Sequence, residues 1–444
     1  MSVNTTETQA SRDAPLFFQR RFLPMWTGFV LGAFADNVLR QALIIGIGFG
    51  AIGLAGVDSG AAALPYVGSL FAFAMLVFSG MAGQIADKYE TALLLRRTKL
   101  VEVIIMAMAA VGFILGAGWF LVLTLFLMGV QSAFFSPVRI GAMPKYLRAD
   151  ELIQGNAICN SGLFVAILSG LAIGGVLIEA PNGALLLGAV LFLSSASGWL
   201  AILKAPKAAP NAPDLKLNFN PLTQTVRVLR YAFQAPGVAP PLLGAAAFYF
   251  VSTFVTVLIP VYIQRAWGAD GGAANFAMAL FAIGAGLGAI SASALSRGKT
   301  GLVAGGYGVA AAAGLSLLVY GLGLAAPAPP NDAPLMSLGE FLAVPITGAL
   351  CVAFCLSAAS LGFFMVPMQA AAQRRAPTER RARVLAAGNI LNAGAAALGS
   401  LAVLFVTQGS IAPNYAFLLV GALCAGVAAV MAWRRSRMAP GLHD

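Results

Sequence analysis

Charged residues, histidine and cysteine are all scarce in this sequence, and each scarcity excludes a class of function. Only 10% of the 444 residues are charged and 59% are hydrophobic, whereas soluble domains average about 25% and 45–50%. The single histidine, His443, leaves no basis for His-based catalysis or a His-ligated metal site. These absences argue against an enzyme and predict no bound cofactor or metal. The four cysteines lie in hydrophobic runs without zinc or disulfide spacing and are expected to pack between helices: Cys159, Cys351, Cys355 and Cys424.

Hydrophobic runs of spanning length dominate what remains. A bilayer core about 30 Å thick needs about 20 apolar residues in a helix, because a helix satisfies its own backbone hydrogen bonds in lipid. The sequence therefore predicts an all-α polytopic membrane protein with 12 transmembrane helices. The tenth run is long enough to tilt or to continue into the cytoplasm. The runs lie at residues 24–47, 62–84, 98–116, 119–139, 154–178, 183–204, 239–263, 273–295, 301–323, 340–369, 384–407 and 413–433.

Lysine and arginine are distributed unevenly, which predicts an orientation. All but two of the 27 basic residues fall at the ends of the chain or in alternate connections between runs; the exceptions are Arg40 and Arg265. Because Lys and Arg accumulate in cytoplasmic loops, both termini are expected in the cytoplasm, which requires an even number of helices. The net charge of +11 thus reflects topology, and no nucleic-acid partner is expected, since that needs a basic polar face with aromatic residues.

A proline-rich segment without a spanning run divides the chain. Residues 205–238 are expected to be a cytoplasmic linker between an N-terminal six-helix bundle, 1–204, and a C-terminal six-helix bundle, 239–444. Within the linker, Leu222–Phe233 has an amphipathic pattern and is expected to form a helix on the membrane surface.

The two halves repeat one another. Phe134-Phe135-Ser136-Pro137 is echoed by Phe363-Phe364-Met365-Val366-Pro367, and Gly155-Asn156 with Asn160 by Gly388-Asn389 with Asn392. An offset of about 230 residues with the same orientation indicates a parallel repeat about an axis along the membrane normal. Six plus six helices with a long central connection are the plan of the major facilitator fold.

Asp36 is the most informative single residue. It lies near the middle of the first run, where an ionised carboxylate costs about 2.5–3.5 kcal/mol on insertion scales, so it should face a wet cavity or a partner. One interpretation is a substrate site; the other is a structural ion pair with Arg40, one turn further along. Asn37 points about 100° away and would serve either the site or a helix contact.

A charged segment after the second run suggests a gate. It resembles the signature loop of the major facilitator superfamily, in which a glycine, an aspartate four residues later and trailing basic residues form a cytoplasmic latch. Glu90 stands where that pattern prefers glycine, so the match is partial. The alternative is a solvated charged turn. The residues expected to act in gating are Gly83, Asp87, Lys88, Arg96 and Arg97.

Glu102, in the third run, has two interpretations. It either pairs with Lys99 or Arg139, or it is a second charge in the cavity. Several amides also lie in the runs, and most such amides tie helices together while some contact substrate. They are Gln131, Asn156, Asn160, Asn389 and Asn392.

Four segments together resemble the bacterial lysophospholipid transporter family, including the transporter portions of acyltransferase and acyl-carrier-protein ligase fusions. The resemblance spans nearly the whole chain and is strongest in the first half. The helix-one Asp-Asn pair and the Phe-Phe-x-Pro-x-basic element are its most specific parts. The segments are Gly32-Ala33-Phe34-Ala35-Asp36-Asn37, the Gly83–Lys88 loop, Phe134-Phe135-Ser136-Pro137-Val138-Arg139, and Arg381-Ala382-Arg383-Val384 through Asn392.

The resemblance implies inward movement of lysophospholipid, typically lysophosphatidylethanolamine, across the bacterial inner membrane for re-acylation on the cytoplasmic side. Some relatives bear an arginine in helix seven, but the comparable stretch 248–253 has none. No ligase or acyltransferase sequence follows Asp444, so a separate enzyme is the expected partner. The expected substrate-binding residues are Asp36, Asn37, Arg40, Arg139, Glu102 and Asn160.

Competing functions remain open from the sequence. A proton-coupled major facilitator exporter of drugs or small metabolites would use Asp36 or Glu102 to carry the proton. A membrane-embedded enzyme is disfavoured because no cluster has catalytic spacing. If the protein were a scaffold without transport activity, Asp36→Ala would leave lipid uptake unchanged.

Overall fold

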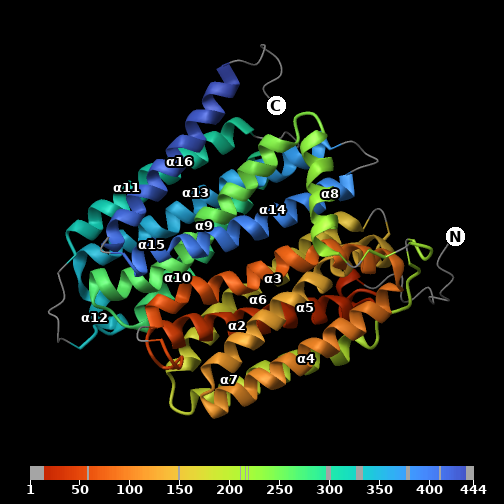
Figure 1. The fold of residues 1–444 in the computed structure, drawn as a ribbon, viewed down its shortest axis with the longest axis horizontal. Coiled ribbons are helices and arrows are strands. Elements are labelled where there is room, and N and C mark those ends of the chain that lie inside the picture. Colours follow the sequence, from red (N-terminus) through yellow and green to blue (C-terminus); the bar gives the residue numbers. More distant parts are fainter. Residues whose placement is uncertain are drawn as a thin grey trace.

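In the computed structural model, long helices form nearly the whole molecule (Figure 1). Twelve of the described helices are long and apolar enough to span a membrane, which confirms the predicted all-α class. The structure describes residues 15–57, 60–148, 151–210, 212–215, 217–218, 220–296, 302–326, 334–376, 381–409 and 412–436. His443 lies outside these residues, as does the side chain of Asn156. In chain order the elements are η1 (Leu16–Phe18), α2 (Leu23–Gly48), α3 (Gly60–Lys88), α4 (Thr91–Leu115), α5 (Gly118–Tyr146), α6 (Leu152–Glu179), α7 (Gly183–Ile202), α8 (Pro221–Gln234), α9 (Ala239–Trp267), α10 (Gly271–Ser296), α11 (Leu302–Leu324), α12 (Leu338–Ala343), α13 (Pro345–Arg375), α14 (Arg381–Ala402), α15 (Leu404–Thr407) and α16 (Pro413–Ser436).

Two predicted helices are each divided in the structure. The run 340–369 forms α12 and α13, which meet at Val344. Pro345 occupies the first position of α13, and a residue that precedes proline is driven out of the helical region, so the helix cannot continue through Val344. The run 384–407 similarly forms α14 and α15, which are separated at Val403.

Charged residues that were expected in loops lie in helices. The helix α4 begins at Thr91, so Arg96, Arg97 and Lys99 are helical rather than in the preceding connection. The helix α5 continues through its two prolines to Tyr146, so Arg139 is helical too. Prolines are tolerated in spanning helices because neighbouring groups satisfy the freed backbone carbonyls. Lys99 is buried in consequence, Arg96 and Arg139 are partly buried, and Arg97 stays exposed.

The early start of α4 follows from a cap that Glu90 provides. Its carboxylate accepts hydrogen bonds from the amides of Ala92 at 2.9 Å and Leu93 at 2.7 Å, the groups that a helix N-terminus leaves unpaired. It also accepts from the amide of Ala208 in the linker, at 2.8 Å. Partial burial raises the pKa of Glu90, but these three hydrogen bonds outweigh it and hold the pKa below its ordinary value.

Replacing Glu90 with alanine is expected to destabilise the fold by about 1 kcal/mol, the usual cost of a lost N-cap. Stability that comes from a lowered pKa is present above the ordinary pKa and is lost as the pH falls through the folded-state pKa. The difference in melting temperature between wild type and variant, measured in detergent, should therefore shrink below about pH 4.5. Glu90→Gln keeps an acceptor oxygen without the titration and serves as the control. A difference for Glu90→Ala that is independent of pH would contradict this account.

Glycine allows the closest helix contacts. Gly284 and Gly288, one turn apart on α10, lie so close to α13 that a Cβ on either would collide with the backbone of Cys355 or Ala359. Gly362 on α13 meets the backbone of α10 in the same way. Small residues at this spacing let spanning helices pack by van der Waals contact, which replaces the hydrophobic drive that lipid cannot supply.

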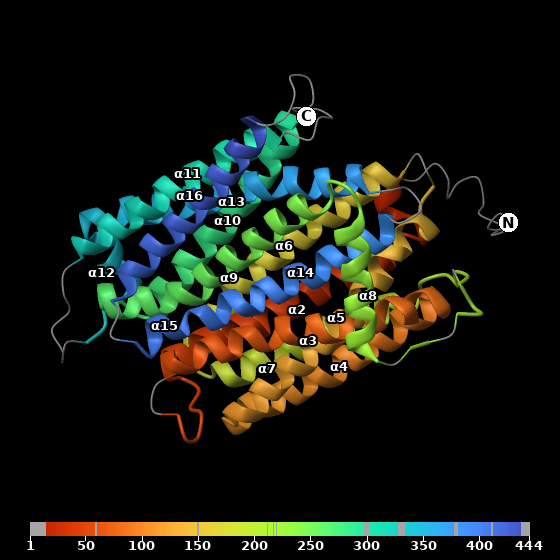
Figure 2. The ribbon, with the colours of Figure 1, turned by 45° about the horizontal axis from the view of Figure 1, so that its top comes forward.

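Helices of the first and second parts of the chain are joined at one end of the bundle. Gln41 of α2 donates to Asn275 of α10 at 2.9 Å, and Asn275 donates to the carbonyl of Ala172 in α6 at 3.4 Å. Ser400 of α14 donates to the carbonyl of Pro65 in α3 at 2.8 Å. All of these residues lie towards the end where α2 finishes and α3 begins, and Figure 2 shows α3 and α14 side by side.

The helix α8 forms where the amphipathic pattern predicted it, and it packs across α3 and α14 at the other end (Figures 1 and 2). Because the number of spans is even, the start of α2 and the end of α16 lie on the same side as α8. The four cysteines are free thiols, and three of them are buried, as expected for packing residues.

Candidate functional site

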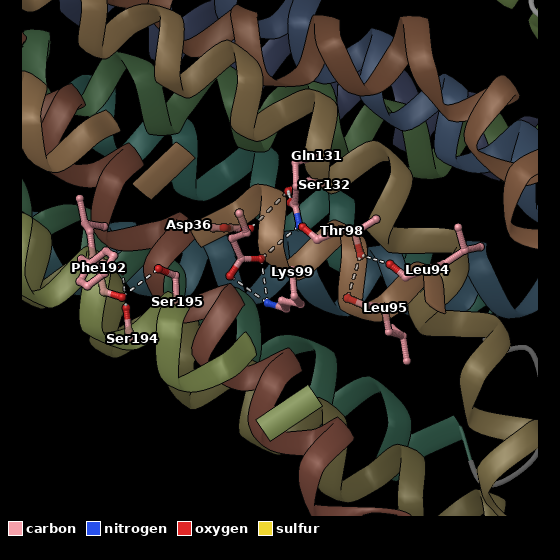
Figure 3. A network of polar contacts seen from close by, with 12 residues as sticks. Asp36, Leu94, Leu95, Thr98, Lys99, Gln131, Ser132, Phe192, Ser194 and Ser195 are labelled. Carbon is pink, nitrogen blue, oxygen red and sulfur yellow. Dashed lines mark hydrogen bonds and ion pairs between the residues drawn. The ribbon is translucent and has the colours of Figure 1, made fainter. Parts of the chain in front are cut away.

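A buried ion pair lies at the centre of a polar network among α2, α4 and α5 (Figure 3). Lys99 Nζ donates to Glu102 Oε1 at 2.9 Å and to Oε2 at 2.8 Å. The two residues are 0% and 1% exposed, so both charges are removed from solvent and depend on each other. Of the alternatives open from the sequence, Glu102 pairs with Lys99 and not with Arg139.

Residues from the two most specific sequence segments surround this pair. Gln131 of α5 donates to Glu102 Oε2 and to the carbonyl of Thr98, both at 3.1 Å. The ring of Phe135 lies with its centroid 4.7 Å from Lys99 Nζ, a cation–π distance. Gly32 of α2 leaves the space that the ammonium occupies, since a Cβ there would collide with Lys99 Nζ. The segments around Gly32 and Phe135 therefore converge on the same buried charges.

Asp36 lies beside the ion pair with an incomplete set of partners. Ser132 Oγ donates to Asp36 Oδ2 at 3.3 Å, whereas Asp36 Oδ1 is buried and accepts no hydrogen bond from any described residue. The carboxylate also interacts electrostatically with Glu102, Lys99 and Arg40. The residue as a whole is partly exposed. A buried carboxylate oxygen without a donor is costly, so this position invites a cationic or donor group from a bound molecule.

The sequence hypothesis of an Asp36–Arg40 ion pair is wrong at the level of direct contact. Arg40 donates instead to Asn37 Oδ1 at 2.7 Å, and Asn37 Nδ2 donates to the carbonyl of Ala33 at 2.7 Å. Asn37 is 8% exposed and thus orients the guanidinium from within the helix bundle. The reason is geometric. The amide of Asn37, three residues before Arg40, lies within hydrogen-bond distance of the guanidinium, and the carboxylate of Asp36, four residues before it, does not.

Arg139 brings a second cation to this region. It is partly exposed, interacts electrostatically with Asp36 and Cys159, and makes no hydrogen bond or ion pair with the described residues. The expected site residue Asn160 is exposed and makes no hydrogen bond within the described part of the chain. Of the other amides, Gln131 belongs to the network and Asn389 is exposed. Asn392 is buried, and its Oδ1 has no donor in the part of the chain that the structure describes.

The residues expected to form a gate hold the linker. Gly83, Asp87 and Lys88 lie in the last turns of α3, so the segment is largely helical, and only Tyr89 and Glu90 separate α3 from α4. Lys88 Nζ donates to the carbonyl of Leu215 at 2.9 Å, and the carbonyl of Asp87 accepts from the amide of Ala212 at 2.9 Å.

Further hydrogen bonds join α3 and α4 to the linker, and together with those of Lys88 and Asp87 they form what we call the linker clamp. Arg96 donates to the carbonyl of Ala205 at 2.7 Å, while Arg97 is exposed on the outer side of α4. Gln84 exchanges two hydrogen bonds with the backbone of Asn218, at 3.0 and 3.2 Å. The departure from the family pattern at Glu90 is explained here, since its carboxylate caps α4 and binds the linker amide of Ala208.

Sequence reasoning named Lys99 as one of two possible partners of Glu102, and it missed Ser132. The i,i+3 spacing of Lys99 to Glu102 and the capping position of Glu90 favour a helical, paired lysine. No sequence signal distinguishes Ser132 from other serines in spanning helices. Across the described residues, no group of three or more His, Cys, Asp or Glu is placed to hold a metal ion.

Twelve spanning helices, three of which surround a buried charge network, define a polytopic membrane protein. The family model described as Major Facilitator Superfamily matches residues 55–338, more than half of the chain, and the protein belongs to that superfamily. Curated relatives carry the name Lysophospholipid transporter LplT, which confirms the resemblance seen in the sequence.

These relatives are similar over part or most of their length. The protein of Cronobacter sakazakii (strain ATCC BAA-894) is 26% identical over 233 residues, which are 52% of this chain and 57% of that protein. The protein of Enterobacter sp. (strain 638) is 24% identical over 330 residues, 74% of each chain.

Solved transporter structures share the fold. A POT family transporter in complex with 5-aminolevulinic acid superposes with a TM-score of 0.70 at 14% identity, over 96% of this chain and 99% of that one. The human organic anion transporter MFSD10 (TETRAN) gives a TM-score of 0.62 at 14% identity, over 93% and 99%. At these identities the likeness concerns the fold alone.

Proposed function

We propose that this protein moves lysophospholipid, lysophosphatidylethanolamine in particular, from the outer to the inner leaflet of the bacterial inner membrane, where a separate cytoplasmic enzyme re-acylates it. The observation that carries the proposal is Asp36, whose Oδ1 accepts no hydrogen bond from the described residues while the cation Arg139 lies within electrostatic range. A zwitterionic headgroup offers the matching charges, an ammonium for Asp36 and a phosphate for Arg139. The names of the curated relatives support the same substrate class.

The charge network suits a headgroup that must cross a low-dielectric core. A single acyl chain anchors a lysophospholipid only marginally, so the main barrier to transfer is the headgroup. Lys99 and Glu102 neutralise each other, whereas Asp36, Arg40 and Arg139 make no direct ion pair with the described residues and stay available to a guest. Opposite charges within electrostatic range of each other replace part of the headgroup's hydration without reorganising on each crossing.

Contacts between the two parts of the chain support alternating access. The hydrogen bonds of Gln41, Asn275 and Ser400 close the bundle at the end away from α8. With the termini and α8 placed on the cytoplasmic side by the positive-inside rule, the closed end is the periplasmic gate. Rocking of the two halves relative to each other would break these bonds and admit substrate from the outer leaflet.

Reconstituted protein is expected to transfer fluorescently labelled lysophosphatidylethanolamine between leaflets of vesicles, with Arg139→Gln at least about tenfold weaker in apparent affinity because a charged hydrogen bond to phosphate is lost. Transfer can be measured by the fraction of label protected from an external quencher. Arg227→Gln, the same change at an exposed position on α8, is the control. Transfer at the protein-free rate would overturn the proposed function, and full activity of Arg139→Gln would overturn the site.

A proton-coupled exporter is the second candidate, and one observation favours it. Asp36 and Glu102 are two carboxylates within electrostatic range of each other, an arrangement that can share a proton. Transport of a small solute that stops when the proton gradient is collapsed, together with no lysophospholipid transfer, would select this candidate instead.

A further inference from the structure

A large groove lies in the second part of the chain, away from the charge network. It runs between α9, α11, α13 and α16 at the end where α9 and α11 begin and α13 and α16 finish, and its volume is about 1270 Å³. Typical small-molecule sites span about 300–1,000 Å³, so this groove exceeds them. In Figure 1, α16 and α11 lie together at the top of the bundle, with α9 and α13 beneath them.

The walls of the groove are apolar along its length. Leu243 and Ala247 of α9, Val303 of α11 and Phe364 of α13 face Val427 and its neighbours on α16. The groove is formed by helices that span the membrane, so in a bilayer its walls adjoin lipid acyl chains. A surface of this kind accommodates hydrocarbon and offers little to a polar solute.

One end of the groove is basic. Arg375 closes it from the last turn of α13, and Arg434 and Arg435 from the last turn of α16. Arg375 donates one hydrogen bond to the carbonyl of Gly237 at 3.3 Å, and both arginines of α16 are exposed. None of the described residues that line the groove is acidic. Three cations with no acidic neighbour among the described lining residues, beside hydrocarbon walls, complement an anionic headgroup that carries acyl chains.

Exposed aromatic residues lie near the arginines at the basic end of the groove. Tyr307, which lines the groove, is 68% exposed, and Trp433, directly before the arginine pair, is 52% exposed. Tyr and Trp concentrate where headgroups meet hydrocarbon, because their rings are apolar and their polar atoms stay hydrated. The arginines therefore lie at the depth of lipid phosphates rather than in bulk water.

We propose that this groove binds one anionic diacyl phospholipid as a resident lipid, with its acyl chains between α9 and α16 and its phosphate held by Arg375, Arg434 and Arg435. The site is separate from the Asp36 network, which lies among α2, α4 and α5. A lipid there fills the space between α9 and the α11–α16 pair and couples the packing of these helices to the charge of the surrounding leaflet.

The test is native mass spectrometry of delipidated protein titrated with phosphatidylglycerol or with phosphatidylcholine of the same acyl chains. Phosphatidylglycerol is expected to occupy one site preferentially, and each arginine-to-glutamine change at the three positions should weaken it about fivefold. A phosphatidylglycerol carrying a photoreactive acyl chain should cross-link to α9 and α16.

A second pair of variants tests the walls. A Cβ at Gly426, which lines the groove, would meet nothing within 4 Å, so Gly426→Leu can fold while filling the space. Gly314 on α11 is equally open and exposed but does not line the groove, so Gly314→Leu is the matched control. Gly426→Leu should abolish the preferred site and Gly314→Leu should leave it intact. Equal binding of both phospholipids, an unchanged site in Gly426→Leu, or displacement of the cross-link by lysophosphatidylethanolamine would overturn the proposal.

Discussion

Lys99→Met is expected to destabilise the folded protein by about 3–5 kcal/mol, because it removes one partner of a buried ion pair and leaves the other charge uncompensated. Glu102 is 1% exposed, and its two oxygens both accept from Lys99 Nζ. Methionine keeps the unbranched length of lysine, so the change tests charge and hydrogen bonding more than volume. The loss should appear as a lower midpoint of denaturant or thermal unfolding in detergent.

The companion variants separate the charge effect from general disruption. Arg97→Met, an exposed change on the same helix, should shift stability by less than about 0.5 kcal/mol. Lys99→Met combined with Glu102→Leu should recover most of the loss, since a buried pair replaced by apolar residues is often neutral. A single variant as stable as the wild type would mean that Glu102 finds another partner or a proton, and that the pair does not hold α4 in place.

Asp36→Asn is expected to reduce lysophospholipid transfer at least about tenfold without lowering the melting temperature. Asn keeps the shape of the side chain but removes the negative charge that would meet the headgroup ammonium. Since Asp36 Oδ1 has no donor among the described residues, folding gains little from the carboxylate, and its removal can even raise stability. Transfer assays on reconstituted vesicles and thermal unfolding in detergent measure the two effects separately.

Ser132→Ala is the matched control for Asp36. It removes the hydrogen bond to Asp36 Oδ2 and leaves the charge, so it should cost much less transfer than Asp36→Asn. If Asp36→Asn unfolds the protein instead, the residue is structural. If the variant transports like the wild type, the headgroup is recognised elsewhere.

The number of spanning helices could be predicted from the sequence, whereas the residues at which they begin and end depend on individual caps and prolines. Every predicted run contains one spanning segment, two of the runs being divided into two helices, because lipid leaves the backbone no alternative to internal hydrogen bonding. The start of α4 was wrong by several residues because the cap that Glu90 provides was taken for a departure from a loop pattern. The predicted end of the fourth run, at residue 139, was too early, because neighbouring groups let α5 continue through Pro144 to Tyr146.

The candidate site residues came from two kinds of argument. Asp36 was selected because a charge inside a hydrophobic run is costly, and that argument needs no coordinates. Asn37 and Arg139 were selected because they match the polar pair and the basic position of the family resemblance. Their partners could not be predicted, since i,i+3 and i,i+4 spacings both offered Arg40 a contact, and only the side-chain geometry placed it on Asn37. The pairing of Glu102 with Lys99 was open for the same reason.

Composition and periodicity alone determined that this protein crosses a membrane with twelve helices, because hydrophobic length is a property of each segment by itself. Tertiary structure decided which charges neutralise each other and which remain available, because that depends on how α2, α4 and α5 face one another. It also revealed the linker clamp at α3 and α4 and the basic-ended groove of α9 and α16. These features join residues that are far apart in the chain, and a local sequence pattern does not predict contacts between distant residues.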